Sequence, residues 1–444
     1  MNGPSDAFAE LLLRRIVESS INAVRPSTLF ERSFHLSGTT LDSFGIPVEM
    51  RLHQNVKCVA LGKSAEAMAF EVKRKLGSAV TGIVATPVAE HLALEGFEFI
   101  RTGHPLPDEE SVKAGEAVSE LVREAEKDDL LIFLISGGGS ASIFVPVEGV
   151  TLVEANEFTK SLFENGVPID KINLVRRHLS KYAGGKLSAL APRVKKLSLV
   201  ISDVVGDNLS AIASGPTVWD GTSPAEALDF LDGSGLLEHA PLSIPAALRI
   251  QQSAPSKIDL ENNMVKVIAS NQDALNAARK VGVESGFDTK VLTRFWESDA
   301  KEAARVLISI ARSIELDKTP ASSPAVILAG GETTVKLSGH GKGGRNQHLA
   351  LCALKELAMI DTGGDVFRRT TVFSFGTDGK DGNSEAAGAS ASLATLREVG
   401  GGRREIDDYI SRDDSNSFFL KYGGLITTGP TDTNVMDIFG IIIV

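Results

Sequence analysis

Short apolar runs alternate with longer amphipathic stretches through the first half of the chain. The apolar runs are continuous, as in "DLLIFLIS" at 129–136, which is typical of strands covered by helices on both faces. The pattern therefore predicts a doubly wound, mostly parallel sheet. The expected strands are 56–62, 81–87, 97–103, 129–136 and 196–204, and the expected helices are 6–24, 63–76 and 108–127.

The pattern weakens at residues 216–256, where Pro, Gly and Ser are frequent. Such a segment is typical of a domain boundary, and a second alternating series follows it. A chain of 444 residues is also too long for one ordinary hydrophobic core. We therefore expect two α/β domains, 1–255 and 256–444. The strands expected in the second domain are 265–270, 288–293, 325–331, 334–338, 370–378, 424–428 and 437–443.

The acidic balance of the chain limits its partners. The formal net charge is −11 at pH 7, which argues against a nucleic acid or an anionic membrane as the main partner, because both bind basic surfaces. No apolar run reaches the roughly 18–20 residues of a membrane span, and the N-terminus lacks the pattern of a secretory signal. The two cysteines, Cys58 and Cys352, are far apart. We expect a cytoplasmic protein without a disulfide framework or a zinc site.

Glycine-rich or polar clusters follow several of the predicted strands. One strand ends in "SGGGSAS" at 136–142, and ligands of parallel sheets bind outside the carboxyl ends of the strands. A glycine turn before a helix can present N–H groups to an anion. The alternative is a tight turn from strand to helix with no ligand. The candidates for binding a phosphate or a carboxylate are Ser136, Gly137, Gly138, Gly139 and Ser140.

Lys63 follows the first strand of the predicted sheet and precedes a helix. The tripeptide "GKS" at 62–64 resembles the end of a Walker A loop, but that motif needs a glycine where Lys57 stands. A lysine at this place can still act as a point charge on a phosphate. The alternative is a solvated lysine in the first helical turn, which the helix dipole disfavours.

The segment "GHGKGG" at 339–344 satisfies the GxGxxG pattern of dinucleotide-binding turns. A single match is weak, and the turn carries more positive charge than a pyrophosphate needs. Gly343 and Gly344 precede Arg345 at the start of a predicted helix, where an arginine can hold a phosphate or a carboxylate through two hydrogen bonds. The alternative for Arg345 is a surface ion pair.

Acidic residues lie in the same clusters after the predicted strands. Carboxylates beside phosphate-binding groups suit Mg²⁺, which binds through one or two carboxylates together with substrate phosphates. Each of these acids can instead form an ordinary turn. The eight histidines form no HxxxH or HxxH pair, which argues against a zinc enzyme. The acids in question are Asp203, Asp207, Glu332, Asp378 and Asp381.

In this order, the clusters resemble the glycerate kinase family of the MOFRL type. The match covers nearly the whole chain, and the combination of "GGRNQ" at 343–347 with "GTDGKDG" at 376–382 is highly specific. The blocks that carry the resemblance are 60–69, 101–111, 134–141, 172–189, 201–217, 327–351, 375–389 and 431–438.

The resemblance implies a kinase that transfers the γ-phosphoryl group of ATP to D-glycerate with Mg²⁺. It implies two α/β domains, the first Rossmann-like, with the active site in the cleft between them. Lys63 and Arg345 match the functional lysine and arginine of the family and would hold the migrating phosphoryl group. The partners would be small molecules, and the protein a monomer or a homodimer.

The remaining site residues are assigned by chemistry within this reading. Asp203 or Asp378 would accept the hydroxyl proton of the substrate. The phosphate or the glycerate carboxylate would meet the residues of the Ser136–Ser140 turn, together with Glu332, Gly343 and Gly344. The expected ligands of Mg²⁺ are Asp203, Asp207 and Asp378.

Two other functions fit parts of the pattern. An NAD(P)-dependent hydroxypyruvate reductase would use the GxGxxG turn and an acid such as His104 or His178, and relatives of the family have carried that name. A sensing module would bind a sugar acid without turnover of ATP. Fold alone does not decide among these functions.

Overall fold

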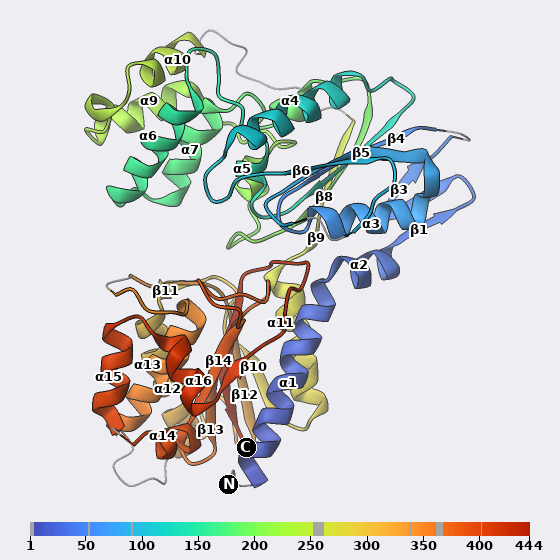
Figure 1. Ribbon diagram of the computed structural model, residues 1–444. Coiled ribbons are helices and arrows are strands. Elements are labelled where there is room, and N and C mark those ends of the chain that lie inside the picture. The colour runs from blue at the N-terminus through green and yellow to red at the C-terminus, as the bar shows by residue number, and fades with distance from the viewer. Residues whose placement is uncertain are drawn as a thin grey trace. The chain divides into compact units, whose positions relative to one another are not determined.

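The computed structural model describes residues 4–51, 54–89, 92–251, 262–336, 339–360, 367–400 and 402–444. The chain packs as two compact units, drawn in Figure 1. Residues 26–268 form the first, here called the parallel-sheet unit, and residues 1–25 with 269–444 form the second, the mixed-sheet unit. The boundary expected at residue 255 lies outside the described residues, so the division into 1–255 and 256–444 stays a prediction.

The parallel-sheet unit is built around six strands. They are β4 (Val56–Leu61), β5 (Val80–Thr86), β6 (Phe97–Arg101), β7 (Leu130–Ile135), β8 (Lys195–Ile201) and β9 (Asn263–Ala269). Their order in the sheet is β6-β5-β4-β7-β8-β9, and the pairs from β6 through β8 are parallel. Every residue of β7 is buried, because helices cover both faces. The mostly parallel sheet predicted from the sequence is confirmed.

The side chains of β4 alternate between the two faces of this sheet. Val59 and Leu61 pack in one hydrophobic cluster with Val118 of α4 (Glu109–Arg123). α3 (Ala65–Leu76) contacts β4 and β5 from the opposite face (Figure 1). α4 begins at a capping box in which Asp108 accepts from the backbone of Ser111, a device that satisfies N–H groups at the helix start.

A group of four helices lies beside the sheet in the parallel-sheet unit (Figure 1). They are α6 (Leu152–Glu164), α7 (Ile169–Leu179), α9 (Pro224–Gly233) and α10 (Ser243–Gln251). Phe158, Leu162, Val175, Leu231 and Leu248 belong to the cluster that holds them together. The described part of the segment 216–256, where the sequence pattern weakens, contains α9, the short 3-10 helix at 237–239 and α10. Pro is tolerated in α9 because it stands in the first turn, after the capping box of Ser223.

The mixed-sheet unit contains a second sheet. Its strands are β10 (Asp288–Val291), β11 (Trp296–Asp299), β12 (Ala325–Thr334), β13 (Thr370–Gly376), β14 (Gly388–Ser392), β15 (Leu425–Ile426) and β16 (Asp437–Ile443). The order is β10-β12-β16-β13-β14-β15, with β11 also paired to β12. β16 enters antiparallel between β12 and β13. The last strand of the chain therefore lies at the centre of the sheet, and all its residues are buried.

Helices from distant parts of the chain cover this sheet. α12 (Ala300–Asp317) and α13 (Arg345–Ile360) share one hydrophobic cluster with β12 and β16. α1 (Pro4–Val24) packs along α11 (Asn271–Glu284), and both contact β16. Thr433 donates a hydrogen bond of 2.8 Å to the Val24 carbonyl. These contacts place the first helix with the C-terminal part of the chain.

Several elements differ from the sequence prediction. The strand expected at 334–338 is absent at 335–336, and residues 337–338 lie outside the described part. The antiparallel strands β1 (Phe34–Ser37), β2 (Thr40–Ser43) and β3 (Ile46–Glu49) were not predicted, because four-residue strands with exposed positions show little periodicity. None of the described helices is long and apolar enough to cross a membrane. The remaining elements are α2 (Pro26–Ser33), η1 (Gly77–Ala79), α5 (Gly139–Ser142), α8 (Lys186–Ala189), η2 (Ile212–Ser214), η3 (Leu237–His239), α14 (Leu393–Glu398), α15 (Gly402–Ser411) and α16 (Ser415–Tyr422).

Candidate active-site residues

The carboxyl ends of β4 and β7 meet at one edge of the parallel sheet. The two strands are neighbours in register, with Leu61 opposite Ile135. The turns that follow them are joined, because the Lys63 N–H donates to the Gly137 carbonyl at 2.8 Å. Lys63 and the glycine turn are therefore held side by side, as the sequence predicts for residues that follow adjacent parallel strands.

Each of the three consecutive glycines is needed for a different reason. A Cβ atom on Gly137 would lie 1.7 Å from Oδ2 of Asp203. Gly138 has a φ of +89°, which other residues rarely adopt. A Cβ atom on Gly139 would lie 2.8 Å from Cβ of Ala213. The "GGG" sequence is thus explained by three requirements, which are the close approach of Asp203 to Gly137, the left-handed backbone of Gly138 and the tight packing around Gly139.

The serine hydroxyls of this turn are used within the protein. Ser136 is buried, and its Oγ donates to the Leu61 carbonyl at 3.1 Å and accepts from the Ser64 N–H at 3.0 Å. The Ser136 side chain therefore joins the two turns. Ser140 Oγ lies 2.8 Å from Ser214 Oγ, so this pair can present one hydroxyl hydrogen or oxygen to a ligand.

His104 lies beside Lys63 and the glycine turn. A Cβ atom on Gly138 would lie 3.3 Å from Cδ2 of His104 and 3.5 Å from Cγ of Lys63. Burial lowers the pKa of His104, and the positive charges of Lys63 and Arg176 lower it further. The imidazole is therefore neutral at pH 7, and the positive charges beside it are those of Lys63 and Arg176.

Asp203 and Asp207 follow β8 in the same unit. Asp203 stands with its carboxylate against the Cα of Gly137, as the glycine geometry shows. Asp207 closes a turn in which its N–H donates to the Val204 carbonyl at 3.0 Å, with a φ of +57°. The structure thus brings Asp203 to the glycine turn, and gives Asp207 the turn-forming role that short acidic residues often have.

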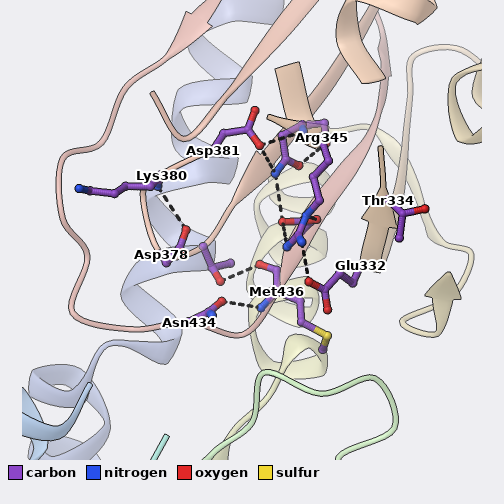
Figure 2. A network of polar contacts seen from close by, with 12 residues as sticks. Glu332, Thr334, Arg345, Asp378, Lys380, Asp381, Asn434 and Met436 are labelled. Carbon is purple, nitrogen blue, oxygen red and sulfur yellow. Dashed lines mark hydrogen bonds and ion pairs between the residues drawn. The ribbon is translucent and has the colours of Figure 1, made fainter. Parts of the chain in front are cut away.

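Arg345 is the first residue of α13 and is held by two carboxylates of the mixed-sheet unit. Its Nε donates to Asp437 Oδ2 at 2.6 Å and its Nη2 donates to Asp437 Oδ1 at 3.2 Å. Its Nη1 donates to Glu332 at the end of β12 at 2.5 Å. Figure 2 shows the Arg345 side chain extended toward Glu332. The sequence alternative of an ion pair therefore describes the contacts of Arg345, although the Asp437 partner is buried rather than on the surface.

The electrostatics of this pair follow from its burial. Burial tends to lower the pKa of Arg345, but the carboxylates of Asp437 and Glu332 outweigh it and raise that pKa. Burial raises the pKa of Asp437 to about 6, and the Arg345 guanidinium opposes the shift. Because that value lies below 7, Asp437 and Arg345 are both charged at neutral pH.

Asp381 occupies the N-terminus of α13. Its two carboxylate oxygens accept from the backbone N–H groups of Asn346 at 3.0 Å and Gln347 at 2.8 Å. Gly344 lets this carboxylate approach, since a Cβ atom there would lie 2.3 Å from Asp381 Oδ1. The Gly343 N–H donates to Asn383 Oδ1 at 2.8 Å. The helix start that the sequence suggests for a phosphate is thus already filled by a carboxylate of the chain.

Asp378 lies close to the same network. A Cβ atom on Gly376 would lie 3.2 Å from Asp378 Oδ1 and 3.4 Å from Asp437 Oδ1, so the two carboxylates approach one glycine. Asp378 Oδ1 also accepts from the Lys380 N–H at 3.2 Å (Figure 2). Asp378, Glu332 and Arg345 therefore belong to one cluster of charged groups.

The predicted site residues thus form two groups, each within one unit. The first contains Lys63, the 136–140 turn and Asp203, and the second contains Glu332, Gly343, Gly344, Arg345 and Asp378. Among the described residues there is no set of three or more His, Cys, Asp or Glu side chains that could hold a metal by itself. The assignment of Asp203, Asp207 and Asp378 to Mg²⁺ stays a prediction, as does the location of the site in a cleft.

The sequence prediction assigned no role to Asp437, the partner of Arg345. The available signal was an acid at the start of the apolar run "DIFGIII" at 437–443, since an acid that precedes a buried strand needs a partner. Asp381 was considered only as one of the acids that could bind Mg²⁺ or form a turn, and its place at the start of α13 was not predicted.

Comparisons with known proteins cover almost all of the chain. The model of a domain of unknown function, DUF4147, matches residues 12–249, and the model of the MOFRL family matches residues 325–437. The D-glycerate 2-kinase of Thermotoga maritima is 35% identical over 96% of this chain and 97% of its own. A protein of Agrobacterium vitis, provisionally named a hydroxypyruvate reductase, is 34% identical over 99% of this chain and 95% of its own.

A solved structure shares the fold as well. The crystal structure of a glycerate kinase from Thermotoga maritima superposes with a TM-score of 0.84 at 33% identity, covering 99% of this chain and 100% of that one.

Proposed function

Since this chain belongs to the glycerate kinase family of the MOFRL type, and is thus a kinase, we propose that it transfers the γ-phosphoryl group of ATP to D-glycerate in a Mg²⁺-dependent, in-line reaction. The name of the Thermotoga maritima relative specifies position 2, which supports the C2 hydroxyl as the acceptor in this proposal. The observation that carries the proposal is the joining of Lys63 to the glycine turn at the carboxyl edge of a parallel sheet.

Lys63 is suited to the transferred phosphoryl group. Its backbone is fixed by the hydrogen bond to Gly137, and the neutral His104 beside it does not add a second charge. Phosphoryl transfer needs positioned positive charge more than covalent chemistry. The N–H groups of the 136–140 turn would contact the phosphate or the glycerate.

Arg345 contributes a positive charge whose direction is set in advance. A guanidinium carries five N–H donors, and three are engaged by Asp437 and Glu332. The other two can bond an oxygen of the phosphoryl group without breaking the ion pair. Glu332, Gly343 and Gly344 then act through Arg345, by fixing the side chain and the helix start.

The carboxylates have two proposed roles, which are binding Mg²⁺ and accepting the hydroxyl proton of the substrate. Asp203 fits Mg²⁺, because its oxygens are hard ligands placed against the glycine turn. Mg²⁺ would neutralise phosphate oxygens when bound. Asp378 is proposed as the second carboxylate, either as a metal ligand or as the acceptor of the C2 hydroxyl proton. Asp207 is the least supported ligand, because it closes a turn.

The test is an assay of ADP release coupled to NADH oxidation, with D-glycerate as substrate. Turnover should require both ATP and D-glycerate, stop in EDTA and return with added MgCl₂. Phosphorus NMR of the product distinguishes 2-phosphoglycerate from 3-phosphoglycerate. Turnover that persists in EDTA, or none with D-glycerate, contradicts the proposal.

A reductase is kept as the second candidate because of the provisional name of the Agrobacterium vitis relative. It predicts loss of absorbance at 340 nm when NADH or NADPH is mixed with hydroxypyruvate and the protein alone. The kinase proposal expects no such loss.

A further inference from the structure

Arg176 is a partly buried cation near the candidate site, and it forms no ion pair among the described residues. It lies in the last turn of α7, and its Nη2 is buried with no hydrogen-bond partner among the described residues. Burial lowers the pKa of the Arg176 guanidinium. A buried charge that nothing compensates is costly, so an anion from solution would stabilise it.

The neighbouring buried cations of the same segment are paired. Arg177 forms an ion pair with Asp220, with Nε 2.7 Å from Oδ2. Its Nη1 donates a hydrogen bond to the Ser210 carbonyl at 3.0 Å. Lys186 donates to the carbonyls of Arg177 and Ser180. The fold thus supplies acceptors to the cations beside Arg176 and leaves Arg176 for another partner.

A small cavity beside Arg176 limits which anion can bind there. A small cavity of about 10 Å³ is lined by Arg176, Ser140, Ser180 and Ser214. About one water-sized atom fits in such a volume. The hydroxyls of Ser140 and Ser214, 2.8 Å apart, stand at this cavity. An oxygen atom of a bound anion would therefore meet a guanidinium and a hydroxyl.

This cavity adjoins the glycine turn rather than a separate part of the unit. Ser140 is part of the turn. The positive charges of Arg176 and Lys63 are both close enough to His104 to lower its pKa. Two cations therefore stand near one turn with a neutral imidazole. One can serve the phosphoryl group and the other a second anionic group of the same substrate.

We propose that Arg176, with the Ser140–Ser214 hydroxyl pair, binds the carboxylate of the acceptor substrate and so selects hydroxy acids over neutral polyols. The proposal rests on the proposed function. A carboxylate is favoured over a phosphate because it is smaller and planar, and the cavity beside Arg176 has room for about one oxygen atom. Arg176 is a specificity-determining residue in this account.

The experiment compares Arg176→Met and Arg176→Lys with the exposed control Arg193→Met. For Arg176→Met, kcat/KM for D-glycerate should fall at least about 30-fold, as for loss of one partner of a buried charge pair, while KM for ATP stays within about two-fold. Arg176→Lys should recover part of the loss, because it keeps the charge but not the fork. The ratio of kcat/KM for D-glycerate to that for glycerol should fall in both variants and stay unchanged in Arg193→Met.

A stability measurement separates this role from a structural one. Because Arg176 has no partner among the described residues, Arg176→Met should unfold at a temperature equal to or above that of the wild type. A lowered midpoint with unchanged KM values means that Arg176 is structural and overturns the proposal. A raised KM for ATP alone assigns the residue to a phosphate and also overturns it.

A measurement of D-glycerate binding tests the site even if the protein shows no kinase activity. Calorimetric titration with D-glycerate, and with glycerol as the neutral probe, measures the carboxylate site directly. Loss of D-glycerate binding in Arg176→Met supports the site whatever the reaction is. Equal binding to wild type and variant contradicts the site, whereas absence of turnover in the wild type contradicts only the proposed function.

Discussion

Arg345 and Asp437 form a two-point ion pair between the start of α13 and the start of β16, with Nε–Oδ2 at 2.6 Å and Nη2–Oδ1 at 3.2 Å. The carboxylate is fully buried, whereas Arg345 is one-third exposed, with a side-chain exposure of 32%. The pair thus anchors the guanidinium from the inside and leaves its outer edge toward solvent. Arg345 is therefore a positioned cation rather than a mobile surface side chain.

The first prediction concerns this anchor. Asp437→Ala should lower kcat by roughly 100-fold, because Arg345 loses its orientation. It should lower the free energy of unfolding by about 2 kcal/mol, because the partly buried Arg345 and the buried Asn346 amide lose an acceptor. Glu332→Gln is the matched control for stability. Its side chain is 44% exposed, so the variant should change stability by less than about 1 kcal/mol. Urea unfolding and steady-state kinetics measure both, and equal stability losses in the two variants would contradict the anchor.

The second prediction concerns Lys63. Lys63→Ala should lower kcat by roughly 100-fold or more, as for loss of one preorganised donor, without changing the circular dichroism spectrum. Lys63→Arg should not rescue fully, because a planar fork differs in reach from a point charge. Lys57→Ala in β4 is the control, because it removes a lysine from the same strand–turn segment. Turnover of Lys63→Ala at the wild-type rate would remove Lys63 from the site.

The third prediction uses the crowding of Gly137. Gly137→Ala should lower kcat/KM by roughly 100-fold, because the new methyl group must displace Asp203, whose Oδ2 would otherwise lie 1.7 Å away. Gly233→Ala is the control, since nothing lies within 4 Å of the added atom and the residue ends a helix. That variant should keep full activity and be neutral or slightly stabilised. An active Gly137→Ala protein would show that the position of Asp203 does not matter.

The fourth prediction concerns pH and His178. Burial and the Lys186 ammonium lower the pKa of His178 from 6.5 to about 4, and Nε2 is bonded to Thr222 Oγ1 at 3.0 Å. The folded state therefore prefers the neutral ring. The contribution of His178 to stability is fully present above pH 6.5 and is lost as the pH falls toward 4. His178→Gln should show a smaller loss of unfolding free energy between pH 7.5 and pH 5 than the wild type. A steeper loss in the variant would contradict the assignment.

The sequence by itself was sufficient to predict the features that depend on residues close together along the chain. Continuous apolar runs predicted the parallel strands, because a strand buried on both faces needs no polar alternation. The "SGGGSAS" turn and Lys63 were found because parallel strands bring their carboxyl ends to one edge. Family motifs along the whole chain identified the kinase family, which the relatives bear out.

Only the tertiary structure decided which distant residues are partners. Asp437 reaches Arg345 because β16 enters between β12 and β13, and Asp381 fills the start of α13 because the 376–382 segment returns to it. The first helix joins the C-terminal sheet through contacts with α11. Local periodicity carries no information about such pairings, because they depend on the order of the strands in the sheet. It also does not reveal which charged side chain lacks a partner, as the Nη2 of Arg176 does among the described residues.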